Sequence, residues 1–222
     1  MGTVTIETDS LCSKEYAALG LKGSRKDNIG KPGVLSLLST FLERSVQKNE
    51  RTMETSDTKD VITIFHGLCA PSLSIEQYID RIFKYSCCSP SCFVIANIYM
   101  DRFMQRTNLS LNSLNIHRLL ITSVMVAAKF IDDAFFNNAY YARVGGVSTA
   151  ELNKLEMKFL FSLDFRLHVS VQTFRKYCAL LKQEAAGGPV ERSIHACGVE
   201  ESWPNKARLR REYHHALKSR QE

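Results

Sequence analysis

Charged side chains stand inside three of the most apolar stretches of this 222-residue chain. Asp101 and Arg102 lie between ANIYM and Phe103, Lys129 follows SVMVAA, and Glu156 lies on the apolar stripe of a helical pattern. An ionised side chain on a buried face is costly unless it is paired or hydrogen-bonded. Each of these charges therefore needs a partner within the chain or a partner molecule.

Partners close in sequence could explain each charge taken alone. Asp101 and Arg102 could mark the solvated end of a helix, and residues three or four positions apart on a helix can form ion pairs. The joint pattern favours a shared function over separate local pairings. The local candidates are Asp132 and Asp133 for Lys129, and Lys154 and Lys158 for Glu156.

The sequence contains none of the motifs that mark common catalytic sites, such as GxxxxGK, GxGxxG, HExxH or GxSxG. Cys87, Cys88 and Cys92 cluster, but a structural zinc site needs a second pair of Cys or His ligands, which the sequence does not offer. An enzyme built on a helix bundle would need constellations such as paired ExxH motifs, and no such pair is present. We therefore predict no catalytic residue, metal or cofactor, and interpret the cysteines as small buried thiols at a helix junction.

Charge and composition exclude further classes. The net charge is +6, and residues 61–183 carry thirteen basic and eight acidic side chains, so the excess does not form a separate basic arm. This distribution argues against nucleic-acid binding. The longest uncharged run, Tyr85–Met100, is too short and polar to cross a membrane. Seven cysteines without a signal-peptide pattern predict an intracellular protein of the nucleus, the cytoplasm or both.

Changes in composition divide the chain into four parts. Residues 1–31 lack periodicity and are predicted to be disordered. Residues 32–60 are predicted to form a flanking helix, which Pro32 opens, and a polar linker at 49–60. Dense apolar periodicity follows in residues 61–186, which we predict to be one domain, and residues 187–222 are predicted to be a basic, poorly ordered tail.

Helix-capping signals divide the central domain into five helices with short connections, and strand patterns are nearly absent. We interpret VITIFH at 61–66 as an N-terminal helix and Asp132–Val147 as a longer connection. The third helix is apolar on nearly all sides, so it must lie in the middle. The predicted fold is therefore all-α, with an extra N-terminal helix. The predicted helix starts are Ser74–Gln77 and Ser148–Glu151, both read as capping boxes, Ser89–Pro90, Asn112 or Ser113, and Ser170.

These segments resemble a cyclin box. The order and spacing of its second, third and fourth helices are matched by MDRF at 100–103, AAKFIDD at 127–133 and ELNKLEMKFLFSLDF at 151–165. Three further segments are similar to the P-type, also called U-type, cyclins of plants, which are relatives of the yeast phosphate-signalling cyclins. These segments are residues 32–50, 74–103 and 137–156.

The resemblance implies a single cyclin box, a five-helix bundle around a central third helix. It also implies a heterodimer with a cyclin-dependent protein kinase, without a small-molecule substrate. Lys129 and Glu156 match the family residues that contact the kinase around its mobile regulatory helix. The family motif residues matched here are Asp101, Arg102, Phe103 and Asp132.

Two departures from cell-cycle cyclins concern the first helix of the box. In the family, the aspartate matched by Asp101 pairs with a first-helix arginine, and Arg81 is the one candidate here. We therefore hypothesise an Arg81–Asp101 pair. The first helix reads YIDRIFKY, and Asp80 and Lys84 break the apolar surface on which those cyclins dock short Arg-x-Leu substrates.

The function predicted from the sequence is a non-enzymatic regulatory subunit. It would bind and activate a cyclin-dependent kinase in cell-cycle or phosphate-signalling control. The alternative is a cyclin-fold binding module in transcription, which contacts DNA or other proteins without a kinase. That alternative would need basic side chains clustered on one face and salt-sensitive DNA binding.

Overall fold

This computed structural model describes residues 16, 19–21, 31–55 and 62–185. These residues contain the helices α2 to α8 and no strand. All of them belong to one of the chain's two units, Met1–Gly188. None of the described helices is long and apolar enough to cross a membrane. The helices are α2 (Gly33–Thr55), α3 (Ile75–Ser86), α4 (Pro90–Thr107), α5 (Ile116–Ile131), α6 (Asn138–Gly145), α7 (Thr149–Ser162) and α8 (Val171–Ala185).

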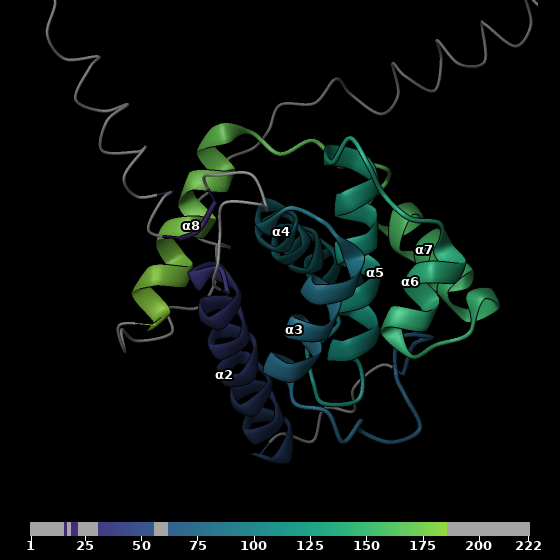
Figure 1. Cartoon of the computed structure of the whole chain (residues 1–222). Helices are drawn as coiled ribbons and strands as arrows, with labels where there is room; N and C mark the ends of the chain where they lie inside the picture. Colours follow the sequence, from purple (N-terminus) through teal and green to yellow (C-terminus); the bar gives the residue numbers. More distant parts are fainter. Residues whose placement is uncertain (1–15, 17–18, 22–30, 56–61, 186–222) are drawn as a thin grey trace, which may run out of the picture. The chain divides into compact units, whose positions relative to one another are not determined.

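Helix α5 lies in the centre of the bundle, as its sequence predicts (Figure 1). Every residue from Leu119 to Ala128 is buried, and α5 contacts α3, α4, α6 and α7. Its two polar side chains in this stretch bond within the helix, Thr122 to the carbonyl of Arg118 and Ser123 to that of Leu120. The all-α bundle around a central third helix of the domain is therefore confirmed.

Helix α6 lies inside the stretch predicted to be a connection. Asn137 caps its first turn by accepting a hydrogen bond from the Tyr140 amide, and Gly146 ends it with a φ of 71°. Gly145 allows close approach to α5, because a Cβ there would lie 2.7 Å from a side-chain carbon of Ile121. Eight residues are too few for a clear hydrophobic period, so only the cap residues could have predicted this helix.

The predicted helix at residues 61–66 is wrong, because residues 62–66 are not helical and contain only a turn, at Ile64 and Phe65. Phe65 is completely buried, and its ring lies 4.9 Å from that of Phe103. The Thr63 amide donates to Nδ1 of His66 at 3.0 Å, which satisfies the backbone without a helix. The buried ring of Phe65 holds this segment in place, so the segment does not need the apolar face of a helix to pack against the core.

Polar residues extend α2 into the predicted linker. The helix continues through Thr55, beyond the predicted linker start at Asn49. The Asn49 side chain donates to the carbonyl of Leu111 at 2.9 Å, and the Glu50 carboxylate accepts from the Ser113 amide at 2.8 Å. The end of α2 therefore holds the loop between α4 and α5, which explains its polar composition.

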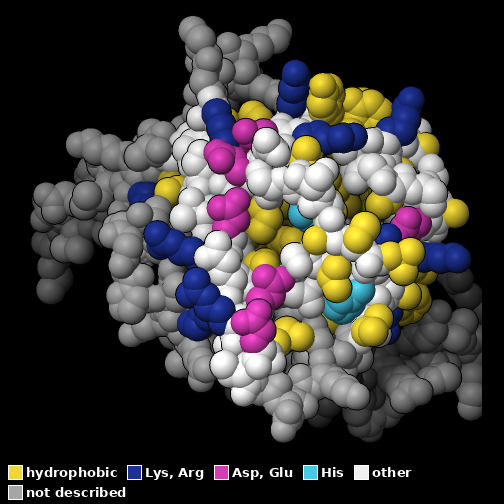
Figure 2. Space-filling view, turned by 90° about the horizontal axis from the view of Figure 1, so that it is seen from below, with side chains coloured by type: hydrophobic (Ala, Val, Ile, Leu, Met, Phe, Trp, Pro, Cys, Tyr) yellow, Lys and Arg dark blue, Asp and Glu magenta, His cyan; other side chains and the backbone are white. Residues whose placement is uncertain are grey.

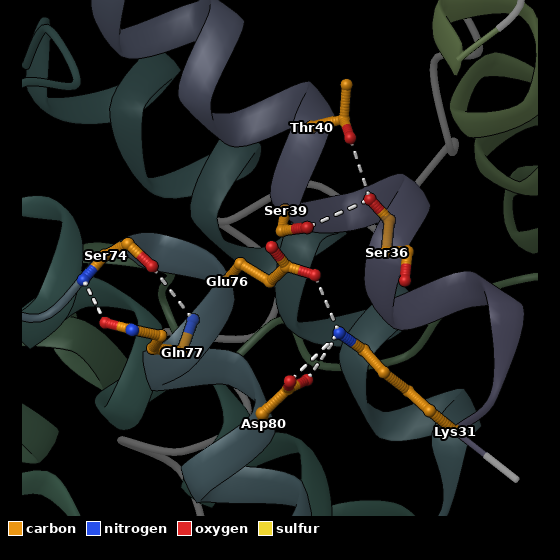
Figure 3. A network of polar contacts seen from close by, with 8 residues as sticks. All are labelled: Lys31, Ser36, Ser39, Thr40, Ser74, Glu76, Gln77 and Asp80. Atoms are coloured by element: carbon orange, nitrogen blue, oxygen red, sulfur yellow. Dashed lines mark hydrogen bonds and ion pairs between the residues drawn. The ribbon is translucent and has the colours of Figure 1, made fainter.

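The predicted helix starts differ in detail. Ser74 and Gln77 form the predicted capping box, with both bonds present (Figure 3). Ser148 accepts from the Glu151 amide at 3.1 Å, but the Glu151 carboxylate pairs with Arg118 at 2.6 Å, so the capping box predicted there is only half formed. A further difference is that α5 begins at Ile116, after a turn that includes both predicted start residues, Asn112 and Ser113.

Some residues of the N-terminal stretch predicted to be disordered are described and packed. Leu19 is 1% exposed, and its carbonyl accepts a hydrogen bond from the start of α2. Lys31 forms ion pairs with Glu76 and Asp80 on α3, at 3.0 and 2.8 Å (Figure 3). These contacts attach the start of α2 to α3. The predicted tail at 187–222 lies outside the described residues.

The loop between α2 and α3 exposes apolar side chains. Ile62 and Leu68 are 85% and 107% exposed, and Ile64 is also exposed. The view from below in Figure 2 shows apolar side chains gathered to the right of a line of acidic ones, with basic side chains to the left of this line and around the upper and right edges. The same loop thus combines the buried Phe65 with exposed apolar side chains close to it in sequence.

This contrast gives a matched test of the fold. Replacing Phe65 by Ala should lower the free energy of unfolding by about 3–5 kcal/mol, because it leaves a cavity in the core. Replacing the exposed Leu68 by Ala should change it by less than about 0.5 kcal/mol. Urea unfolding followed by circular dichroism measures both values, and similar losses for the two variants would contradict the assigned burial.

Candidate functional site

The structure brings together two of the charges that the sequence singles out, Lys129 near the end of α5 and Glu156 in the middle of α7. The Lys129 Nζ lies 2.7 Å from the Glu156 Oε1, and their side chains are 26% and 15% exposed. They are 27 residues apart in sequence. The local alternatives for Lys129, Asp132 and Asp133, are not its partners. The pair is instead a half-buried bridge between two helices, at the surface of the bundle.

Asn138 completes this cluster from the first turn of α6. Its side-chain carbonyl accepts a hydrogen bond from the Lys129 ammonium, and its amide nitrogen donates to Oε2 of Glu156 at 2.7 Å. The same nitrogen also donates to the side-chain oxygen Oδ1 of Asn153 at 2.7 Å. Sequence reasoning missed Asn138, because it placed no helix there; the cap at Asn137 is the signal that could have located it.

Large apolar side chains are exposed on the same elements. Phe130 follows Lys129 and is 51% exposed, and Met157 follows Glu156 and is 50% exposed. Charged anchors among exposed apolar groups are typical of surfaces that bind another protein. We define the α5–α7 face as the Lys129, Glu156 and Asn138 cluster together with Phe130, Ile131, Phe135, Phe136, Met157, Phe161 and Phe165.

A strained turn after α7 presents one of these rings. Asp164 and Phe165 both have positive φ, 58° and 57°, which is rare for bulky residues. The Arg102 guanidinium holds the following chain by donating to the carbonyls of Arg166 and His168 at 3.1 and 3.0 Å. Arg102 therefore supports the turn that keeps Phe165 exposed, with its ring 5.3 Å from that of Phe161.

Comparisons with known proteins agree with this architecture. A family model described as Cyclin matches residues 33–167. The chain belongs to the cyclin family. It is 55% identical over 196 residues to Cyclin-P3-1 of Oryza sativa subsp. japonica, covering 87% of this chain and 83% of that protein. It is 49% identical over 209 residues to Cyclin-U3-1 of Arabidopsis thaliana, covering 93% and 95%. The predicted resemblance to plant P-type and U-type cyclins is confirmed.

In this cyclin, Asp132 joins the start of α4 to the end of α5. Its carboxylate accepts from the amide and the hydroxyl of Ser89, at 2.9 and 2.8 Å, and from the Cys92 thiol at 3.1 Å. A carboxylate at a helix N-terminus is favourable because the helix dipole is positive there. Asp132 therefore fixes the end of α5, one turn after Lys129, and does not itself pair with the lysine.

The cysteines beside Asp132 are consistent with structural thiols. Cys88 and Cys92 are buried, whereas Cys87 is exposed, so the prediction of three buried thiols is wrong at Cys87. A hydrogen bond to Cys88, together with burial, raises the pKa of Cys92 far above its ordinary value, so its thiol stays protonated. Among the described residues, no group of three or more His, Cys, Asp or Glu side chains could hold a metal.

Arg81 and Asp101 do not form the hypothesised pair. Arg81 donates to the carbonyls of Val144 and Arg143 at the end of α6, at 2.8 and 3.2 Å. Asp101 accepts a hydrogen bond from the Tyr177 hydroxyl on α8. Burial and the Asp101 carboxylate both raise the pKa of Tyr177, so this hydroxyl remains a donor. The two residues serve different contacts, α3 with α6 and α4 with α8.

Double-mutant cycles should separate these contacts. For Asp101→Ala and Tyr177→Phe, we expect a coupling energy of about 1–3 kcal/mol in the free energy of unfolding, because the two groups share one charged hydrogen bond. For Arg81→Ala and Asp101→Ala, the effects should add within about 0.5 kcal/mol. A large coupling in the second cycle would restore the Arg81–Asp101 hypothesis.

Proposed function

We propose that this cyclin binds a cyclin-dependent protein kinase through the α5–α7 face and activates it. The observation that carries the proposal is the Lys129–Glu156 bridge, held between two helices beside exposed Phe130 and Met157. The cyclin would contribute no catalytic group. This fits a regulatory protein, as its membership of the cyclin family indicates.

The chemistry of the bridge suits recognition of a protein backbone. A lysine ammonium can donate to exposed carbonyls, and a glutamate carboxylate can accept from exposed amides. Charge-assisted hydrogen bonds are about twice as strong as neutral ones, and partial burial of Lys129 and Glu156 limits competition from water. Further along α7 and in the turn after it, the exposed Phe161 and Phe165 offer apolar area that a partner can remove from water.

Activation would follow from a shift in the kinase population. An active kinase needs its own Lys–Glu ion pair, and the glutamate of that pair lies on a mobile helix. A rigid face that binds this helix in one position favours the active state over the others. The α5–α7 face is suited to this role because α5 is fixed at its buried core and at Asp132.

The family relationship supports a role in cell-cycle or phosphate-signalling control, within the nucleus, the cytoplasm or both. The surface of α3 supports a substrate choice different from that of cell-cycle cyclins. Asp80 is engaged by Lys31, and Lys84 lies over the ring of Tyr85, so α3 carries charge where those cyclins are apolar. Substrates with short Arg-x-Leu docking motifs are therefore not expected to be favoured.

A charge exchange tests the proposed interface. Lys129→Glu alone should weaken binding to a purified cyclin-dependent kinase by at least about 30-fold, because a desolvated charge loses its partner. The Lys129→Glu, Glu156→Lys double variant keeps the internal ion pair, so its melting temperature should recover toward wild type. Its kinase binding should stay weak, because each charge now faces the wrong backbone group.

Pull-down from a panel of cyclin-dependent kinases, followed by a phosphorylation assay with and without the cyclin, provides the measurement. Equal capture by wild type and the double variant would show that the interface is wrong. If wild type captured and activated no kinase of the panel, the proposal itself would fail, and salt-sensitive DNA binding would become the next measurement.

A further inference from the structure

The Asn138 side chain engages the Lys129–Glu156 bridge as a peptide group would. Its carbonyl accepts from the lysine ammonium, and its N–H donates to the glutamate carboxylate. A main-chain amide offers the same combination, one carbonyl acceptor and one N–H donor. The free chain therefore already contains an amide in the place that the proposed function assigns to the kinase backbone.

This amide is held firmly. Its nitrogen has a second partner, the side-chain oxygen Oδ1 of Asn153, at 2.7 Å. With Asn138 in place, only 15% of the Glu156 side chain and 26% of the Lys129 side chain remain exposed. A partner that approaches the α5–α7 face meets a bridge whose hydrogen-bonding groups are already engaged.

The position of Asn138 allows it to leave. It is half-buried at the first residue of α6, and the cap of that helix is made by Asn137, not by Asn138. Turning its side chain into water would break its bonds to Lys129, Glu156 and Asn153 without uncapping α6. Side-chain rotations at exposed sites take picoseconds to nanoseconds, so the rotation itself is not a slow step. Asn138 would instead lower the association rate by reducing the fraction of the cyclin that is ready to bind.

We propose that Asn138 is a specificity-determining residue, a resident amide that a kinase must displace with a main-chain amide of its own. This inference rests on the proposed function. A partner with an exposed carbonyl and N–H at the right spacing replaces the lost hydrogen bonds in kind. A partner without them leaves the half-buried charges with fewer bonds than in the free cyclin, and is rejected.

The Asn138→Ala variant tests the sign of this effect. Removing the resident amide should tighten binding to a purified cyclin-dependent kinase by roughly 3- to 10-fold, mainly through faster association, because a larger fraction of the cyclin is ready to bind. The matched control is Asn153→Ala, which removes only the bond that retains Asn138. It should change the affinity in the same direction and by less. Surface plasmon resonance gives both rate constants.

A second measurement follows Asn138 directly in the wild-type chain. The side-chain amide protons of Asn138, observed by NMR in ¹⁵N-labelled cyclin, should be protected from exchange in the free chain. They should lose that protection when the kinase is added. Protection that persists in the complex would overturn the inference.

The possible failures can be told apart. If wild type binds the kinase and Asn138→Ala binds more weakly at an unchanged melting temperature, Asn138 positions the bridge and is not displaced, so the inference fails while the proposed function stands. If Asn138→Ala does not fold, the NMR measurement on wild type still decides. If wild type binds no kinase of the panel, the proposed function fails and the inference fails with it.

Discussion

Helix α5 must be buried on nearly all sides, and this constraint sets the arrangement of the rest of the domain. Its residues from Leu119 to Ala128 have no solvent-facing side, so α3, α4, α6 and α7 have to surround it. Beyond this buried stretch, the last turn reaches the surface with Lys129 and Phe130. The end of this otherwise buried helix is therefore the part that the proposed function assigns to binding. The rigidity of that end follows from the burial of the preceding turns.

A charge at the end of such a helix needs a precise environment. Lys129 obtains it from α7 through Glu156 and from α6 through Asn138, so three helices meet at one ammonium group. Asp132, one turn later, is used differently, because it caps α4 through Ser89. Lys129 and Asp132 are close in sequence but do not pair, because each bonds to a residue of another element, Glu156 and Ser89 respectively. The separation leaves the lysine bridge to face solvent while the aspartate fixes the helix behind it.

The sequence predicts the helices whose apolar period or cap is clear, and it identifies Lys129 and Glu156 because charges interrupt apolar runs. It does not predict what depends on contacts between distant segments. The segment around Phe65 is held by one buried ring and not by the apolar face of a helix. Neither helix propensity nor hydrophobic periodicity predicts such an anchor. Asn138 is one polar residue in a polar stretch, and its role appears only when α6 packs on α5 at Gly145. Arg81 is the one first-helix arginine that the sequence offers as a partner for Asp101, but in the structure it donates to backbone carbonyls of α6, and the residue types of a sequence do not reveal such acceptors.

The family motif around Asp101 gains a physical explanation from these contacts. Asp101, Arg102 and Phe103 point to three different places: to Tyr177 on α8, to the carbonyls after the strained turn, and into the aromatic core beside Phe65. One turn of α4 thus connects the core, the last helix and the turn that exposes Phe165. Positive φ at Asp164 and Phe165 is unfavourable in isolation, and it persists because the Arg102 bonds hold the chain just beyond the turn. The motif therefore supports the α5–α7 face by fixing a backbone conformation, while the residues proposed to bind a partner come from α5, α6 and α7.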